Sequence, residues 1–369
     1  MSKTEQRPYI GGQAVIEGVM MRSPRSFSIV VRRRAGVLVV RERPISGGPK
    51  SWLAWPLVRG CTALVEAVKL GAEALRFSSK LYEEDMLAAE AAAPKGGALS
   101  TLALPMALLA TGDPEPSAPK PAEAHDGGSR AFSYLMIAIA IAFFVALPQA
   151  AAAWSSRLFG WHLDVRSPPF QALTGAFKIA IVVGYLLLIR RIPEIRRVFQ
   201  YHGAEHKTIS TYEAGEPLTV ENARSKSTLH PRCGTTFLVM VALVSIFVFS
   251  AIAPLLPRFD LGAVVDNVTL FVLKLPFLPV IAAVTFEIQR LLARHCTRGA
   301  LRALLWPGFL VQKITTIEPS DDQLEVALAS LQATLWRERA GSAAPAQVVN
   351  RMFADFATLS ADPGYVAAA

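Results

Sequence analysis

The chain has 369 residues, of which 52% are hydrophobic and only 18% are charged, and its formal net charge is +9. Soluble domains contain about 25% charged residues. The composition therefore excludes an ordinary soluble protein, and because the apolar residues occur in long blocks it indicates an integral membrane protein. The positive charge is compatible with nucleic-acid binding, but in a membrane protein it more often reflects cytoplasmic arginines that face anionic lipid.

Targeting and cysteine usage agree with a multi-pass protein of a reducing compartment. Residues 1–8 are polar, and no apolar segment of a signal peptide follows them. Three cysteines at unrelated spacings do not form a disulfide framework. They are Cys61, Cys233 and Cys296.

Residues 1–50 predict a small β unit. Residues 11–22 (GGQAVIEGVMMR) are rich in glycine and nearly uncharged, which indicates either close packing against another element or a tight turn. A β-hairpin with one solvent-exposed, arginine-rich face is expected next, because apolar and polar residues alternate on both sides of Ala35-Gly36. The alternating apolar residues are Phe27, Ile29, Val31, Val37 and Val39.

Residues 51–92 have a helical hydrophobic period. Trp52 and Trp55 at the start favour a helix in the membrane interface, but a core helix of a cytoplasmic domain has the same pattern. Residues 93–130 predict a disordered linker or insertion, since they are rich in Pro, Ala and Gly.

A membrane domain is expected over residues 131–288. Four segments have about the 20 apolar residues that a transmembrane helix needs. These segments are 131–154, 170–192, 236–256 and 264–288. Residues 190–235 contain eight Lys and Arg, whereas loops 155–169 and 257–263 contain three between them. The positive-inside rule therefore places both termini and the His-rich loop 193–235 in the cytoplasm.

Two of the predicted spans contain a lysine, Lys178 and Lys274. A charge at that depth either faces the bundle interior, water or a partner, or extends to the outer headgroups. A transporter that uses these lysines fits poorly, because four spans make a small transport core unless the protein oligomerises.

Residues 289–340 predict cytoplasmic helices. Arginines recur at every fourth position and would form a basic stripe against anionic lipid headgroups. They are Arg290, Arg294, Arg298 and Arg302. Residues 317–324 resemble a capped helix start, with the helix running to about Arg339. The tail, 341–369, is rich in Ala and carries no prediction.

The central loop carries the strongest chemical pattern. His202 and His206 are four residues apart, so on a helix their imidazoles point the same way. With Glu205 between them they form the zincin motif in reverse order, in which two His bind the metal and the Glu is the general base. Zinc, or another divalent transition metal, would lower the pKa of a water ligand toward ~7.

His230 and Cys233 are the obvious further ligands, because only two residues separate them in a turn. Four protein ligands would make a closed, structural site. Three ligands, with Cys233 left as a nucleophile or neighbouring group, would leave an open catalytic position. The alternative is that the histidines only hydrogen-bond headgroups or carboxylates such as Glu213.

At these residues the chain resembles the YqhQ-like family of bacterial membrane proteins, described as a predicted metal-dependent enzyme. The resemblance covers about residues 9–82 and 131–335. It rests on residues 11–22, 202–207 (HGAEHK) and 230–235 (HPRCGT), and on a C-terminal signature at 307–308 and 315–319. Ile317 stands where an arginine is expected. The resemblance implies a bacterial inner-membrane location and does not by itself establish catalysis.

The first interpretation is a mainly α-helical integral membrane protein with about four transmembrane helices, a small β unit and a cytoplasmic metal site that hydrolyses an amide or ester bond. Accessory roles fall to Lys207 and Arg232, and to Glu17 and Arg22 as an acid or anion clamp. The rival is a non-enzymatic scaffold or assembly factor whose metal is structural and whose basic surface binds lipid, a protein or an RNA-containing assembly. Under either interpretation the protein could form a homo-oligomer.

Overall fold

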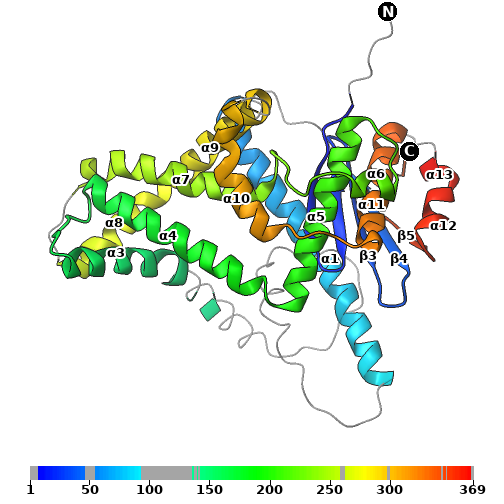
Figure 1. Cartoon of the computed structure of the whole chain (residues 1–369), viewed down its shortest axis with the longest axis horizontal. Helices are drawn as coiled ribbons and strands as arrows, with labels where there is room; N and C mark the ends of the chain where they lie inside the picture. Colours follow the sequence, from blue (N-terminus) through cyan, green and yellow to red (C-terminus); the bar gives the residue numbers. More distant parts are fainter. Residues whose placement is uncertain are drawn as a thin grey trace, which may run out of the picture.

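The computed structural model describes residues 7–45, 55–92, 135–136, 139, 142–257, 262–296, 300–341, 344–345 and 347–366. The predicted linker 93–130 lies outside the described residues, as do Trp52 and a third of the predicted first span. A β-sheet with its covering helices forms one end of the molecule, and a group of apolar helices forms the other (Figure 1).

The predicted hairpin is the centre of a five-stranded antiparallel sheet in the order β1-β2-β3-β4-β5. Its strands are β1 (Gly11–Val15), β2 (Gly18–Arg22), β3 (Ser26–Arg32), β4 (Leu38–Pro44) and β5 (Val349–Phe353). Val30 is paired with Val40 across the hairpin, and Gly36 has the positive φ of 86° that the turn requires. The tail, for which the sequence carried no prediction, supplies β5 as the edge strand beside β4.

The prediction that one face of the hairpin is exposed to solvent is wrong, because helices cover both faces of the sheet. On one face, α1 (Val58–Ala92) packs on Phe27 and Ile29. On the other, α11 (Asp321–Ala340) packs on β2, β3 and β4, and Ser28 donates to the Ser330 carbonyl at 2.8 Å. The alternating polar positions therefore meet a helix surface and not water.

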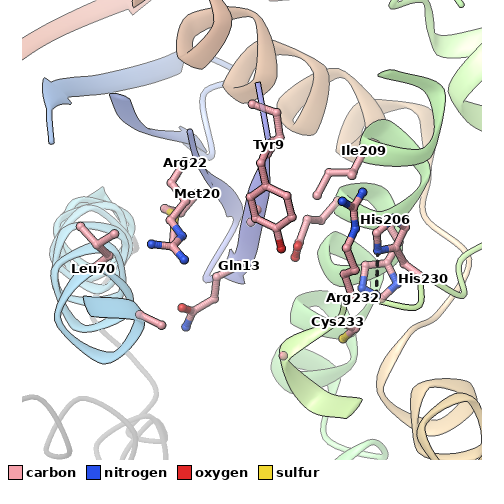
Figure 2. A pocket seen from close by; sticks show the side chains of 16 residues that line it. Tyr9, Gln13, Met20, Arg22, Leu70, His206, Ile209, His230, Arg232 and Cys233 are labelled. Atoms are coloured by element: carbon pink, nitrogen blue, oxygen red, sulfur yellow. Dashed lines mark hydrogen bonds between the residues drawn. The ribbon is translucent and has the colours of Figure 1, made fainter. Parts of the chain in front are cut away.

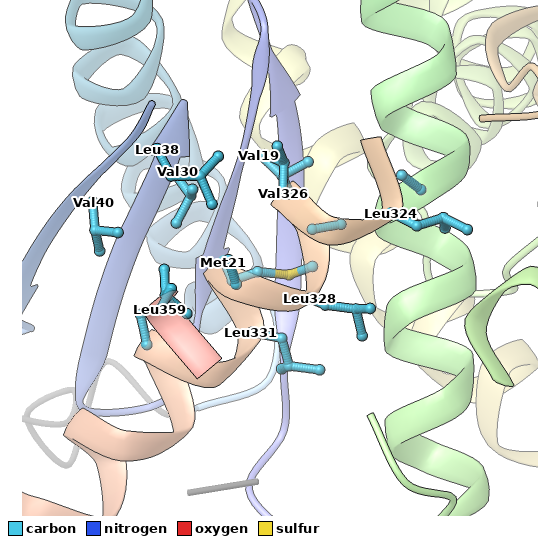
Figure 3. Close-up of a cluster of buried hydrophobic side chains, with 14 of the residues drawn as sticks. Val19, Met21, Val30, Leu38, Val40, Leu324, Val326, Leu328, Leu331 and Leu359 are labelled. Atoms are coloured by element: carbon cyan, nitrogen blue, oxygen red, sulfur yellow. The ribbon is translucent and has the colours of Figure 1, made fainter. Parts of the chain in front are cut away.

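The larger hydrophobic core joins the sheet, α11 and α5 (Pro193–Ala214), and Figure 3 shows its centre. Its labelled members are Val19, Met21, Val30, Leu38, Val40, Leu324, Val326, Leu328, Leu331 and Leu359. The short helices α12 (Phe356–Ala361) and α13 (Pro363–Val366) close this core from the tail.

The predicted capped helix start is confirmed as the start of α11. Ser320 and Gln323 form a reciprocal capping box, which satisfies backbone donors in the first turn. Most of this helix is buried, because it lies between the sheet and α5. A helix covered on several sides has only weak apolar periodicity.

The predicted helix of residues 51–92 is α1, and it connects the two ends of the molecule. Leu70 and Ala74 belong to the core beneath the sheet, as the core-helix interpretation expects. Its first turns pack on α9 (Leu278–His295), where Arg59 forms an ion pair with Glu287.

Within the part of the chain that the structure describes, three helical segments are long and apolar enough to cross a membrane. They are α4 (Pro168–Ile189), residues 234–255 starting with α7 (Gly234–Ile252), and residues 268–295 formed by α8 (Ala263–Lys274) and α9. The expected first span is described only in part, and its described end forms α3 (Leu147–Leu158).

Two further helices complete the fold around the site. Between the spans and α11 lies α10 (Trp306–Thr315), which packs on α7. The short helix α6 (Val220–Arg224) follows α5. The helix that carries Arg290 and Arg294 ends at His295. Arg298 of the expected stripe lies outside the described residues.

Candidate metal centre

The two motif histidines lie on one helix, as predicted. Pro193 occupies the first turn of α5, where its missing N–H costs nothing. The rings of His202 and His206 are 4.4 Å apart between centroids. Gly203 stands between them because a Cβ there would lie 2.2 Å from the carbonyl oxygen of Ile317.

Cys233 comes from a different element and joins the two histidines. It is the N-cap of α7, so its position is fixed by the start of that helix. Its Sγ lies 3.2 Å from His202 Nε2. One ligand atom each from His202, His206 and Cys233 all lie within 4.8 Å of one another, which is a compact N₂S donor set of the kind that suits zinc.

Backbone carbonyls orient both imidazoles. Nδ1 of His202 lies 2.9 Å from the Thr315 oxygen, and Nδ1 of His206 lies 2.5 Å from the Thr228 oxygen. An Nδ1–H that donates to a carbonyl leaves Nε2 as the free ligand atom, which is the usual arrangement of a metal-binding histidine. His206 Nε2 is buried without a hydrogen-bond partner among the described residues. Such an atom is costly unless something binds it, so these residues fit a metal ion.

Glu205 lies beside this group, in contact with the sheet. Its side chain approaches the edge strand β1 so closely that a Cβ on Gly12 would lie 2.8 Å from the carboxylate. The N–H of Ala14 donates to the carboxylate, and burial raises the pKa of Glu205 although His202 and His206 oppose that shift. Of the two interpretations of residues 11–22, close packing against another element is therefore confirmed for Gly12, which lies within a strand and not in a turn.

The charges of His202 and Cys233 are coupled. Burial opposes both charged forms, but their mutual attraction outweighs it. The pKa of His202 rises to about 9, and the pKa of the Cys233 thiol falls well below its usual range. Thr235 N–H, in the first turn of α7, also donates to Cys233 Sγ at 3.3 Å. In the metal-free protein this attraction favours an imidazolium beside a thiolate, and the Nε2 proton would be released when a metal binds.

His230, the fourth predicted ligand, does not join the donor set. Its Nε2 lies 3.4 Å from Glu213 Oε2, and burial lowers the pKa of its imidazole to about 4. Gln312 holds its backbone, since the amide accepts from His230 N–H and donates to the His230 carbonyl, both at 2.8 Å. The ring of His230 remains 5.7 Å from that of His206.

The predicted accessory residues divide into two groups. Glu17 is turned away, because its carboxylate accepts from Arg197 Nε and Nη2 at 2.5 Å. Lys207 also points elsewhere, with its Nζ 2.6 Å from Glu318 Oε1. Arg22 and Arg232 do reach the site, where both line a cavity that borders the donor set.

This cavity of about 160 Å³ lies between α1, the first two strands, α5 and the start of α7 (Figure 2). Arg22 and Arg232 approach it from opposite sides, and Tyr9 lies between them. Its lining residues are Tyr9, Ile10, Gly11, Gly12, Gln13, Met20, Arg22, Ala67, Leu70, Glu205, His206, Ile209, His230, Arg232, Cys233 and Gly234.

The two lysines of the predicted spans are not among the residues that line this cavity. Lys274 donates to Gln171 Oε1 at 2.7 Å, and its Nζ lies 5.1 Å from the centre of the Phe249 ring. Lys274 therefore has partners within the helix bundle. Lys178 is half-buried on α4.

Comparison with known proteins agrees with the resemblance. Residues 55–337 match the family described as "Protein of unknown function (DUF1385)". The chain belongs to the DUF1385 family. It is also 32% identical over 339 residues to "Uncharacterized protein YqhQ" of Bacillus subtilis (strain 168), a match that covers 91% of this chain and 95% of that protein. No solved structure matches the chain.

Several residues that shape the site in this DUF1385 protein carried no signal in the sequence. Gln312 and the carbonyl oxygens of Thr315 and Thr228 act through contacts with residues 22 to 113 positions away. Gln13 reaches the cavity from β1, and Tyr9 reaches it from the segment just before β1. Only the glycine pattern before Gln13 indicated that this strand packs closely on another element.

Proposed function

We propose that the chain is a multi-pass protein of the bacterial inner membrane whose cytoplasmic part binds a divalent transition metal, zinc first, and hydrolyses an amide or ester bond. The observation that carries this proposal is the N₂S donor set of His202, His206 and Cys233, with its ligand atoms within 4.8 Å and both imidazoles oriented by carbonyls. Three protein ligands are typical of catalytic zinc sites, which keep a fourth position open.

In this proposal each residue has one task. His202, His206 and Cys233 would hold the ion, which would supply an electrophile for a carbonyl or phosphoryl oxygen and acidify water. Glu205 would accept the proton on its carboxylate. Its raised pKa brings its basicity closer to neutral pH, which favours a general base. Glu205 also lies outside the set of close ligand atoms, which supports a base and not a ligand.

The membrane part of the proposal rests on the three apolar helices and on charge asymmetry. Residues 190–235 contain eight Lys and Arg, whereas the loop 155–169 contains two. This asymmetry favours the metal centre on the cytoplasmic side. Basic residues at the ends of these helices would bind anionic headgroups.

A second candidate is a cysteine hydrolase that needs no metal. His202 Nε2 is 3.2 Å from Cys233 Sγ, and the N-terminal turn of α7 stabilises a thiolate. A thiolate and an adjacent, oriented histidine are the parts that covalent catalysis requires. The scaffold alternative needs a fourth protein ligand to complete the coordination of the metal. The contact of His230 with Glu213 disfavours this alternative, because it holds the predicted fourth ligand away from the donor set.

Elemental analysis of the purified protein, paired with complementation of a deletion strain, tests these functions. We expect about one zinc per chain. Glu205→Gln should keep the metal and lose function, since general-base catalysis contributes about 10²–10⁴-fold in rate. A zinc-loaded, abundant and fully functional Glu205→Gln protein would contradict the assigned role.

Two further variants separate the alternatives. A functional protein without metal whose activity disappears in Cys233→Ser would favour the cysteine hydrolase. If His206→Ala is harmful through loss of stability while Glu205→Gln is silent, the metal is structural and the protein is a scaffold.

A further inference from the structure

The cavity beside the metal centre brings two guanidinium groups to opposite walls. Arg22 comes from β2, and Arg232 comes from the turn before α7 (Figure 2). Each is only partly exposed, with 26% and 32% of its side chain accessible. Two cations that face one small cavity from separate elements repel each other unless an anion lies between them.

Among the residues that the structure describes, each guanidinium is paired with one carboxylate. Arg22 Nη1 lies 3.0 Å from Glu66 Oε2 on α1, and Arg232 is paired with Glu213 on α5. Arginine has five N–H donors, and one carboxylate cannot accept from all of them. Both arginines therefore keep donors for a further anion.

One end of the cavity meets the start of a helix. Gly234, which lines it, is the first residue of the 19-residue helix α7. The start of a helix carries a partial positive charge and unpaired N–H groups, which favour an anion. The same helix opens an apolar segment long enough to cross a membrane, so the cavity lies at the level where a lipid headgroup would be found.

The size of the cavity limits what it accepts. Its volume of about 160 Å³ is smaller than the roughly 300–1,000 Å³ of sites for drug-sized ligands. Glu205 and Cys233 of the metal centre line one side. Neutral polar groups lie elsewhere in the walls, among them the exposed amide of Gln13 and the Tyr9 ring, over which Arg232 stacks at 4.9 Å. A small polyoxygen anion fits these walls, with the rest of the molecule outside.

We propose that this cavity binds a phosphate group of the substrate, gripped by Arg22 from one side and Arg232 from the other. This inference rests on the proposed function, because it assigns a substrate group to the same site. Two arginine forks from separate walls match the several oxygens of a phosphate, whereas one fork already satisfies the two oxygens of a carboxylate. The phosphate belongs to a lipid headgroup or to a water-soluble ester.

The test measures binding to the purified full-length protein. Glycerol 3-phosphate is titrated by calorimetry in detergent, and phosphatidic acid is titrated in nanodiscs, with diacylglycerol as the phosphate-free control. We expect Arg22→Gln and Arg232→Gln each to weaken binding at least about tenfold, as expected for the loss of a charge-assisted contact. Glu66→Gln should strengthen it, because the competing carboxylate is gone, which a purely structural ion pair would not do. Arg196→Gln, an exposed arginine outside the cavity, is the matched control and should bind like the wild type.

Preference between the two phosphate probes identifies the source of the group. The inference is overturned if the wild type binds neither probe, if diacylglycerol binds equally well, or if the cavity variants behave like Arg196→Gln. Metal content of the same preparations keeps the two proposals apart. A metal-free protein that binds a phosphate probe through Arg22 and Arg232 would overturn the metal hydrolase and retain the phosphate site. A zinc-loaded protein that binds neither probe would overturn the phosphate site and retain the metal hydrolase.

Discussion

Replacing Gln312 by leucine removes the side chain that fixes the turn before α7. Gln312 is fully buried, and its amide accepts from His230 N–H and donates to the His230 carbonyl and to Thr236 Oγ1, at 2.8, 2.8 and 2.6 Å. Leucine has a similar volume, so the cost comes from three buried polar groups that lose their partner. At about 1–3 kcal/mol for each group, and because the Thr236 hydroxyl can rotate to another acceptor, we expect a loss of about 3 kcal/mol.

The same change should weaken metal binding. Cys233 lies three residues after His230, so a displaced turn moves its thiolate relative to His202 and His206. Loss of a residue that supports a ligand lowers metal affinity by about 10–100-fold. The assays are a zinc titration against a competing chelator and the melting temperature in detergent, where we expect a decrease of about 5 °C or more.

Gln289→Leu is the matched control for Gln312→Leu. Gln289 contacts the same turn, but by the single hydrogen bond from its Nε2 to the Cys233 carbonyl at 3.2 Å. Its loss should cost only about 1 kcal/mol. If Gln312→Leu matches this control in both melting temperature and zinc affinity, the role assigned to Gln312 is wrong.

Three further predictions concern packing, pH and topology. Gly203→Ala should lower the melting temperature despite the better helix propensity of alanine, because its Cβ would lie 2.2 Å from the Ile317 oxygen. The control Gly184→Ala, whose Cβ meets nothing within 4 Å, should be neutral or slightly stabilising. Equal effects of the two changes would contradict the close approach at Gly203. Burial raises the pKa of Glu42, although nearby arginines oppose this shift. Because the carboxyl ionises more easily in the unfolded chain, the wild type should lose stability relative to Glu42→Gln as pH rises above about 4.5. A difference in melting temperature between the two proteins that does not change with pH would refute this. In cells, a cysteine at exposed position 159 should react with an impermeant label and a cysteine at exposed position 214 should not; the opposite result would reverse the proposed orientation.

The local part of the site was predictable from the sequence. Residues four apart on a helix share a face whatever surrounds them, so the pairing of His202 with His206 followed from spacing alone. The same holds for the alternation that indicates the central hairpin and for the capping pattern at the start of α11. Segments long enough to cross a membrane are also recognised by length and composition, and three of the four predicted ones are long, apolar helices in the structure.

Contacts between distant segments were not predictable, because they depend on how the elements pack. The sequence separation of His230 and Cys233 does not say which way their side chains point. The hydrogen bonds of Gln312 to the His230 backbone and the position of Glu213 turn the His230 ring away from the donor set. Glu17 pairs with Arg197 because the β1–β2 hairpin lies along α5. The tail joins the sheet as β5 because β4 leaves an unpaired edge there.

The sequence by itself therefore determined which residues are candidate ligands and which helix carries two of them. Only the tertiary structure decided that the third member is Cys233, that Glu205 lies against the edge of β1, and that Arg22 and Arg232 face one cavity. The physical reason is the range of the forces involved. Helical periodicity is set by backbone hydrogen bonds over four residues, whereas the position of a side chain from another element is set by close packing, in which displacements of an ångström decide which atoms meet.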